Sequence, residues 1–451
     1  MISGNLVEEQ HKIGFAARTY NAYQWMVPLC LTLKKEKEAF EYTERCKSRA
    51  FLDVLAATEI RPTVEVIGEL QLLLDDEEMY LARLREIQTR HLRPIKISVE
   101  PGEVEKIYEN LTHIYNEIER FDPEYVFTRR GKPLSLDDLQ DILSSQKRNT
   151  VLIEYFITEE KTYIFVIPSR DHQLHMKSIL LPAETLNTYL EDWRKVAINL
   201  DAQKTSHCLI EPVSEYLNKG DLIYFVPYGP LHYFPLHALV SNGEPLIKNH
   251  PVAYLPSASI LPFCQNKGTG RLKTCASFGV SFEKEAEKVA EFFNTKAYTG
   301  SSATAENLET CNTDIIHLSC HGLFDDKDPL SSRIQLHDRE LTARDIFNMR
   351  LTTELVTLSA CETGYNERSP GDELIGLTRA FLYAGTPSVI VSLWPVYGPP
   401  TQELMTEFYR QLKNSKEKAT ALQKAQIKIM ESEKYSHPYF WAPFILIGNW
   451  K

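Results

Sequence analysis

The first third of the chain alternates apolar and polar positions with the period of an α-helix. Two long segments, Phe15–Lys35 and Glu36–Ala57, are joined by a short charged turn and predict an antiparallel helical hairpin. Two further helices are expected at Val66–His91 and Glu103–Phe121. The last of these carries its apolar residues three or four positions apart, at Ile107, Leu111, Ile114 and Ile118. Such stripes indicate helix–helix contacts rather than a ligand site.

The pattern changes near residue 150, where short runs of β-branched and aromatic residues begin. Before it, the segment Arg129–Leu143 predicts a loop and then a helix whose N-cap is Ser135 or Asp137. The runs that predict strands are TVLIEYFIT, TYIFVIPS, MKSILLP and DLIYFVP. Helices are expected at Ala183–Asn199 and Leu209–Leu217. Residues 150–265 therefore predict half of an α/β domain.

From Thr274 onward, strands and helices alternate regularly. The expected strands are CASFGV, KAYTG, DIIHLSCHG, ELVTLSACETG, SVIVSLWPV and WAPFILIGN. The helices between them include EKEAEKVAEFF, AENLE and LIGLTRAFLYAG, the last closed by Gly385, and two more precede the final strand. Alternation with nearly continuous apolar strands predicts a mostly parallel sheet flanked by helices on both faces, preceded by an all-α region.

Composition and charge narrow the possible partners. The chain has 451 residues and a formal net charge of −11, which argues against direct binding of nucleic acid. No apolar run approaches the roughly 20 residues needed to cross a bilayer, and the N-terminus lacks a secretory pattern. The eight cysteines are dispersed. These features predict a cytoplasmic protein with buried, reduced thiols.

Two strands of the second half end in residues that can do chemistry. DIIHLS is followed by Cys320, His321 and Gly322, and ELVTLSA is followed by Cys361 and, three positions later, Gly364. Ligands bind beyond the carboxyl ends of strands in open α/β sheets. If the two strands are neighbours, His321 and Cys361 share one rim of the sheet, and each glycine permits a sharp turn there.

This pair is what thiol nucleophilic catalysis requires. An imidazole within hydrogen-bond reach of a thiol raises its reactivity as a thiolate and can then protonate the leaving amine. The backbone amides of Gly322 and Cys361 could stabilise a tetrahedral oxyanion. A strand-end His or Cys is more often structural when it occurs alone, so the pattern by itself leaves the structural interpretation open.

A zinc site is the alternative use of the same segment. Its ligands would be His317, Cys320, His321 and Cys361. Alternation along a regular strand sends His317 and Cys320 to opposite faces, and no second ligand pair recurs elsewhere in the chain. We therefore expect neither a metal nor another cofactor.

Long, consecutive motifs carry a resemblance to a known family. They are DIIHLSCHG, LVTLSACETG, GDELIGLTRAFLYAGTPSVIVSLWPV, HPYFWAPFILIGNW, LIYFVPYGPLHYFPLHALV and AYLPSAS. Together they resemble the CHAT family, the caspase-like peptidase domains found with tetratricopeptide repeats and related to caspases, separases and gingipains. The likeness spans roughly Leu139 to Lys451. AFEYTERCKSRAFLDVL further resembles the last tetratricopeptide unit that often precedes this domain.

The resemblance implies a caspase-like fold in which a pseudo-peptidase half precedes the active half. It carries a catalytic dyad onto His321 as general base and Cys361 as nucleophile, with no obligatory third member. The first half has no counterpart of these motifs, and we interpret its His232 and His237 as structural. The expected domains are a tetratricopeptide-like hairpin at 1–62, a helical linker region at 63–148, the inactive half at 149–270 and the active half at 271–451.

One segment departs from the family pattern. After SLWPV the family usually has an acidic pair, where this chain has Tyr397 followed by Gly-Pro-Pro. That departure leaves the dyad intact but puts substrate preference and regulation in doubt. Asp372 and Glu373 are candidates for an acidic pocket that binds a basic P1 residue, and the alternative is that they cap the following helix. The acidic loop after His321, with Asp325, is expected to be solvated.

Two classes of function follow from the resemblance. The first is a cysteine endopeptidase that cleaves a protein partner and is gated by its helical N-terminal region or by a regulatory protein bound there. The second is a signalling scaffold that keeps the caspase-like fold without cleaving. The single repeat-like unit and the missing acidic pair motivate the second.

Overall fold

Two compact units make up the computed structural model of the protein. It describes residues 22–56, 62, 64–89, 102–130, 133–188, 208–280, 282–323, 325, 329–362, 373–396, 398–415 and 417–451. One unit comprises Met1–Leu33 and Glu41–Pro133, and the other comprises Lys34–Phe40 and Leu134–Lys451. We describe each unit by itself.

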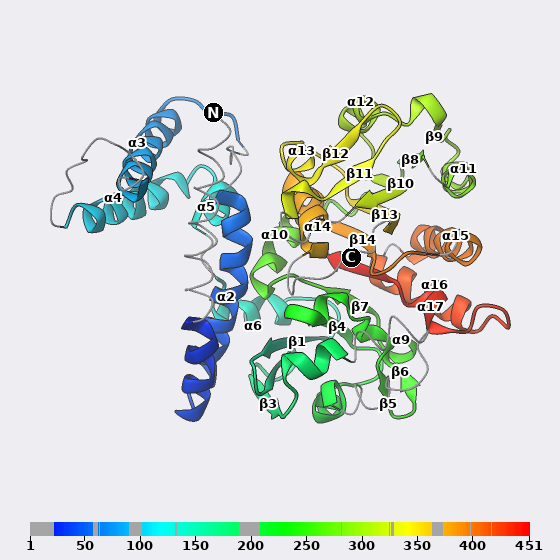
Figure 1. Ribbon diagram of the computed structural model, residues 1–451, viewed down its shortest axis with the longest axis horizontal. Coiled ribbons are helices and arrows are strands. Elements are labelled where there is room, and N and C mark those ends of the chain that lie inside the picture. The colour runs from blue at the N-terminus through cyan, green and yellow to red at the C-terminus, as the bar shows by residue number, and fades with distance from the viewer. Residues whose placement is uncertain are drawn as a thin grey trace. The chain divides into compact units, whose positions relative to one another are not determined.

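The first unit is helical, as the apolar stripes predict. Residues 22–32 form a helix, and a turn with Lys34 at a φ of 57° leads into α2 (Glu36–Ala56). Helices α3 (Glu69–Thr89) and α4 (Glu103–Ile118) lie side by side (Figure 1), and α5 (Pro123–Arg130) follows. Ten buried residues form their common core, namely Leu70, Leu84, Ile87, Ile107, Leu111, Ile114, Tyr115, Ile118, Tyr125 and Val126. The predicted stripe of α4 is therefore a helix–helix contact.

A buried carboxylate connects the helices of this unit. Glu77 of α3 is 1% exposed, and it accepts a hydrogen bond from the Tyr125 hydroxyl and pairs with Arg129 Nε at 3.0 Å. Burial raises the pKa of Tyr125, so its hydroxyl keeps the proton that it donates. The carboxylate thus has its partners on α5 and stabilises the packing of α3 against it.

A single mixed sheet runs through the second unit. Its first half holds β1 (Thr150–Ile157), β2 (Thr162–Pro168), β3 (His175–Ile179), β4 (Leu222–Val226) and β7 (Val252–Tyr254). Its second half holds β8 (Cys275–Gly279), β9 (Tyr298–Thr299), β10 (Ile315–Leu323), β11 (Arg333–Gln335), β12 (Glu340–Thr342), β13 (Leu355–Glu362), β14 (Ser388–Ser392) and β15 (Phe444–Gly448). A short hairpin of β5 (Val240–Ser241) and β6 (Glu244–Pro245) stands apart.

The strand order is β12-β11-β10-β13-β14-β15-β7-β4-β1-β2-β3, with β8 and β9 beside β10. Strands β8, β10, β13 and β14 are parallel to one another, and so are β15, β7, β4 and β1. The two groups meet at the antiparallel pair β14–β15. The carboxyl ends of the two groups therefore lie at opposite edges of the sheet.

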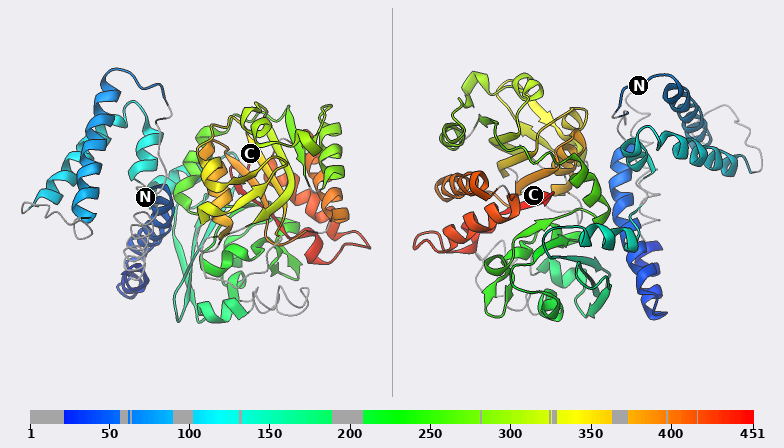
Figure 2. Two further views of the ribbon diagram at one scale, coloured as in Figure 1. Left: turned by 45° about the horizontal axis from the view of Figure 1, so that its top comes forward. Right: turned by 180° about the vertical axis from the view of Figure 1, so that it is seen from behind.

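Helices cover both faces of the sheet, which its apolar strands require. Helices α11 (Glu283–Phe292) and α15 (Gly398–Ser415) lie on one side of the second half, and α13 (Ala343–Phe347) and α14 (Glu373–Ala384) lie on the other (Figures 1 and 2). Helix α16 (Lys418–Met430) packs against α15. Residues 22–32 and the other described helices include none that is long and apolar enough to cross a membrane.

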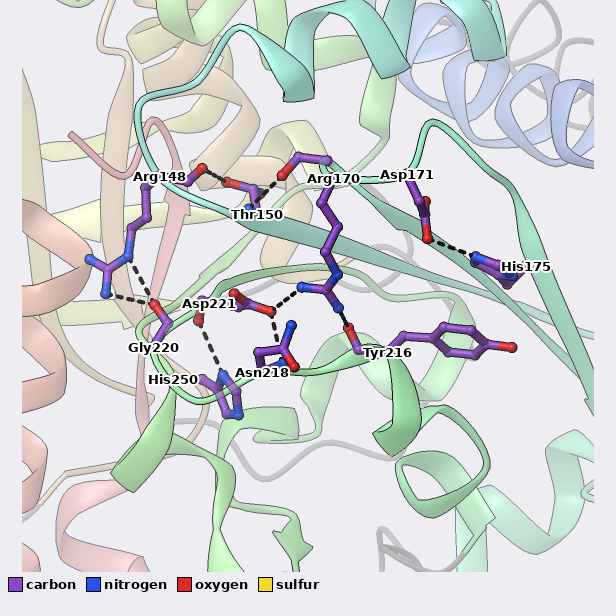
Figure 3. A network of polar contacts seen from close by, with 11 residues as sticks. Arg148, Thr150, Arg170, Asp171, His175, Tyr216, Asn218, Gly220, Asp221 and His250 are labelled. Carbon is purple, nitrogen blue, oxygen red and sulfur yellow. Dashed lines mark hydrogen bonds and ion pairs between the residues drawn. The ribbon is translucent and has the colours of Figure 1, made fainter.

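Polar contacts at the amino ends of the first-half strands hold those strands together (Figure 3). Arg148 donates two hydrogen bonds to the carbonyl of Gly220, at 3.2 and 3.0 Å. Arg170 pairs with Asp221 at 2.8 Å, and the same carboxylate accepts from the amide of Asn218. These contacts connect the chain before β1 and after β2 to the turn that precedes β4.

The fold class expected from the sequence, a mostly parallel sheet flanked by helices and preceded by helices, is confirmed. Several local elements differ from expectation. Helix α5, the β11–β12 hairpin and α13 were not expected, and the helix expected at Leu209–Leu217 is largely a 3-10 helix at Glu211–Tyr216. Helix α6 (Leu136–Ser144) is capped by Ser135, whose side chain accepts from the amide of Asp138, and not by Asp137.

Candidate active site

Strands β10 and β13 are neighbours, and their register pairs the two residues proposed from the sequence. They run parallel, and His321 lies opposite Cys361. Since paired residues of neighbouring strands face the same side of a sheet, both belong to one face and to the carboxyl edge of the second half. The structure describes the backbone of Cys361, and its side chain lies outside the described residues.

The imidazole of His321 is half-buried and contacts the segment that precedes α11. The ring of Phe282 packs edge-on against it, with the two centroids 6.2 Å apart. Among the residues that the structure describes, no group forms a hydrogen bond with its buried Nδ1 atom.

Both strands extend slightly beyond the pair, in contrast to the turn expected at Gly322. Strand β10 continues to Leu323, and Gly322 pairs with Glu362 of β13 and with Ile334 of β11. Gly322 is thus part of the sheet rather than of a sharp turn, because the hairpin β11–β12 adds a strand to this end of β10. Gly364 lies outside the described residues.

A row of buried polar side chains leads up to His321 on the same face. His317 and Ser319 of β10 lie opposite Thr357 and Ser359 of β13, and all four are fully buried. The imidazole of His317 is 3.0 Å from the Tyr409 hydroxyl and 3.0 Å from Ser319 Oγ. From the sequence, we considered His317 only as a zinc ligand. Ser319 follows it by two residues and His321 by four, and this even spacing along a strand indicates that the three polar residues share a face.

The remaining candidates lie around this edge or outside the described residues. Glu373 is the first residue of α14, although its side chain is not described, and Asp372 lies outside the described residues. Tyr397 also lies outside the described residues. The Gly-Pro-Pro that follows it forms the first turn of α15. Proline is favoured there because its missing N–H would have no intrahelical partner. The backbone amide of Asp325 donates to Ser332 Oγ at 3.0 Å.

Burial makes several other thiols poor nucleophiles. It raises the pKa of Cys264 to about 12 and that of Cys311 to about 11, and it also raises the pKa of Cys275 and Cys208. These thiols stay protonated near neutral pH. Within the described ranges, no three His, Cys, Asp or Glu side chains converge as ligands of a metal ion would.

Comparison with known proteins identifies the fold of this site. The family model of the CHAT domain matches residues 201–449, more than half of the chain and both strands of the candidate site. The chain belongs to the CHAT domain family. The resemblance stated from the motifs is confirmed.

Two curated relatives share sequence with parts of this CHAT protein. Tetratricopeptide repeat protein 28 of Mus musculus is 38% identical over 124 residues, which cover 28% of this chain and 5% of the relative. The Homo sapiens protein of the same name is 31% identical over 209 residues, covering 38% of this chain and 8% of the relative. The chain thus matches less than a tenth of the length of these relatives, whose names refer to the repeats that the N-terminal hairpin resembles.

Two solved structures match this chain at low sequence identity. The Saccharomyces cerevisiae separase–securin complex matches with a TM-score of 0.48 and 11% identity, over 92% of this chain and 37% of that one. The Arg-specific cysteine proteinase gingipain R matches with a TM-score of 0.38 and 11% identity, over 58% of this chain and 69% of that one.

Proposed function

We propose that this CHAT protein is a cysteine endopeptidase that cleaves a protein partner through His321 and Cys361. The observation that carries the proposal is the parallel register in which these two residues lie opposite each other at the carboxyl edge of β10 and β13. The buried Nδ1 atom of His321, which lacks a hydrogen-bond partner among the described residues, supports a role beyond structure.

In the proposed reaction, the Cys361 thiol transfers its proton to His321 as its sulfur attacks the peptide carbonyl. The imidazolium then protonates the leaving amine, and water hydrolyses the thioester with His321 acting again as base. The backbone amides of Gly322 and Cys361 are proposed to donate to the tetrahedral oxyanion. Burial raises the pKa of the Cys264 and Cys275 thiols, which makes them poor alternatives to Cys361 as nucleophile.

Substrate choice and regulation are assigned to the segments around the pair. We propose that Asp372 and Glu373, at the start of α14, receive a basic P1 side chain. We further propose that the helical N-terminal region, or a protein bound to it, gates access. We also propose that residues 149–270 form an inactive half and residues 271–451 the active half.

Peptide cleavage by the purified chain tests the proposal. A peptide library and candidate partner proteins are incubated with the parent, Cys361→Ala and Cys275→Ala, and new N-termini are identified by mass spectrometry. Cys361→Ala should reduce turnover by at least about a thousandfold, because the nucleophile is absent. Cys275→Ala removes another buried thiol of the same sheet and should retain turnover. Cleavage that survives Cys361→Ala would contradict the proposal.

The scaffold alternative is motivated by the single repeat-like unit and by the Gly-Pro-Pro that begins α15, where the family usually carries an acidic pair. Under it, the parent would bind a partner protein but cleave none of the library. Cleavage that depends on both His321 and Cys361 would exclude this alternative.

A further inference from the structure

A set of buried polar residues lies directly beneath the candidate dyad. We use the name polar ladder for His317 and Ser319 of β10 together with Thr357 and Ser359 of β13, four fully buried residues in two register pairs on one face. The next register pair on that face is His321 with Cys361. Burying polar groups is costly unless they are hydrogen-bonded, so the contacts of the ladder decide what it does.

His317 is held from two helices at once. The Tyr409 hydroxyl of α15 donates to Thr357 Oγ1 at 2.9 Å, so toward Tyr409 the imidazole is the donor, and its Nδ1 atom carries the proton at 3.0 Å. On the other side of the ring, Nε2 lies 3.0 Å from Ser319 Oγ and 3.1 Å from the Glu285 carboxylate of α11. Glu285 is only 4% exposed, and its carboxylate attracts the ring when Nε2 carries a proton as well.

The helix that carries Glu285 also reaches the dyad. Gly279 of β8 lets α11 approach the sheet closely, since a Cβ there would lie 2.8 Å from both Glu283 Cα and Ala286 Cβ. Phe282, the residue before α11, packs edge-on against the ring of His321. The interaction between Glu285 and His317 therefore fixes the same helix end that contacts His321.

We propose that Glu285 and His317 are positioning residues for His321, an inference that rests on the proposed peptidase function. Together they hold α11 and Phe282 against the His321 ring from the side and fix the Ser319 hydroxyl beneath it. Loss of either contact is expected to change the orientation of the His321 ring. Misplacement of a reacting group by about 1 Å typically lowers a rate by about a hundredfold.

The test follows alkylation of Cys361 by iodoacetamide as a function of pH, which requires no substrate. The thiolate sulfur attacks the methylene carbon, iodide leaves, and the thiol proton goes to His321. Peptide mapping reports Cys361 separately from the other thiols. In the parent, alkylation should persist well below the usual thiol pKa of about 8.5, and His321→Ala should remove that persistence.

Glu285→Gln and His317→Asn should each lower Cys361 alkylation at pH 6.5 by about tenfold. Each should also reduce kcat for peptide cleavage with KM little changed, because substrate binding is untouched. Ser388→Ala is the matched control. Ser388 of β14 is equally buried, and its hydroxyl donates to the carbonyl of Asn449 at 2.7 Å rather than to α11 or the ladder. Cys361 of this control should be alkylated to the same extent as Cys361 of the parent.

The outcomes separate the inference from the proposed function. Identical profiles for the parent and His321→Ala would overturn both. A profile that depends on His321 but is unchanged in Glu285→Gln and His317→Asn would overturn only the positioning role, as would an equal loss in Ser388→Ala. If Glu285→Gln fails to fold, Tyr409→Phe removes one hydroxyl from the far side of His317 and keeps the ring, and it should also lower alkylation.

Discussion

At the scale of single residues, burial controls which side chains can carry charge. His237 is 2% exposed, its Nδ1 lies 2.9 Å from the Tyr254 hydroxyl, and its Nε2 lies 3.1 Å from the amide nitrogen of Gln426. Burial lowers its pKa to about 3, so it is neutral in the folded protein. A neutral, enclosed imidazole of this kind serves packing, in contrast to the half-buried ring of His321.

This difference predicts a pH dependence of stability. The unfolded chain binds a proton at His237 below a pKa of about 6.5, whereas the folded chain does so only below about 3. The stabilisation is therefore complete above about pH 6.5 and is lost as the pH falls toward 3. His237→Gln should be less stable at pH 7 and should lose less stability between pH 7 and pH 4, as measured by urea unfolding. Equal losses in the two proteins would contradict the assignment.

The residue types along the strands indicated His321 and Cys361 as site residues, but they gave no indication of Glu285. His321 and Cys361 stand out because each follows an apolar run. Glu285 could not be assigned a role from the sequence, because it lies in an amphipathic helix where a carboxylate is expected at the surface, and only the packing of α11 reveals it as buried.

At the scale of elements, one buried ion pair connects three segments. Lys418, at the start of α16, donates to Glu354 Oε1 at 2.8 Å and to the carbonyl of Lys451. The second oxygen of Glu354, just before β13, accepts from the amides of Thr269 and Gly270 at 2.6 and 2.9 Å. Burial lowers the pKa of Lys418, and the charge of Glu354 opposes that shift. The pair joins β13, α16 and the linker before β8.

Breaking this pair should strongly destabilise the second unit. Glu354→Gln leaves a buried ammonium without its counter-charge, and loss of one partner of a buried pair typically costs about 3–5 kcal/mol. Urea unfolding followed by tryptophan fluorescence measures the change. Glu215→Gln breaks the exposed pair with Lys177 and is the control; it should leave the midpoint nearly unchanged, because water screens that pair. Similar midpoints for both variants would contradict this account of the buried pair.

Periodicity predicted long elements better than short ones. Strands β1, β2, β10 and β13 have seven to nine residues with nearly continuous apolar character, and their positions follow from the sequence. The strands β11 and β12 have three residues each, too few to show a period. Pro212 lies in the first turn of Glu211–Tyr216, where an α-helix also accepts proline, so it does not account for the 3-10 helix there.

At the scale of the whole molecule, two units each have their own core, and this predicts two separable unfolding events. Leu111 is 4% exposed in the core of the first unit. Leu111→Ala should destabilise that unit by about 2–5 kcal/mol and shift one of two calorimetric transitions. A uniform shift of a single transition would show that the units unfold together.

The sequence established the helical region, the sheet and the family, because these depend on long periodic segments and long motifs. The opposite directions of the two groups of strands depend on the β14–β15 pairing, which brings together segments separated by α15 and α16. Such a long-range pairing leaves no local signature in the sequence. Only the structure therefore shows that the carboxyl ends of the two groups of strands lie at opposite edges of the sheet.

Covalent labelling of the native protein tests the pairing of His321 with Cys361 most directly. A peptidyl acyloxymethylketone is added to the parent, to His321→Ala and to urea-unfolded parent, and the modified residue is identified by peptide mass spectrometry. Rapid modification of Cys361 in the native parent, with little in His321→Ala or in the unfolded chain, is the predicted result. Equal labelling of Cys361 in the parent and His321→Ala, or preferential labelling of another cysteine, would contradict the dyad.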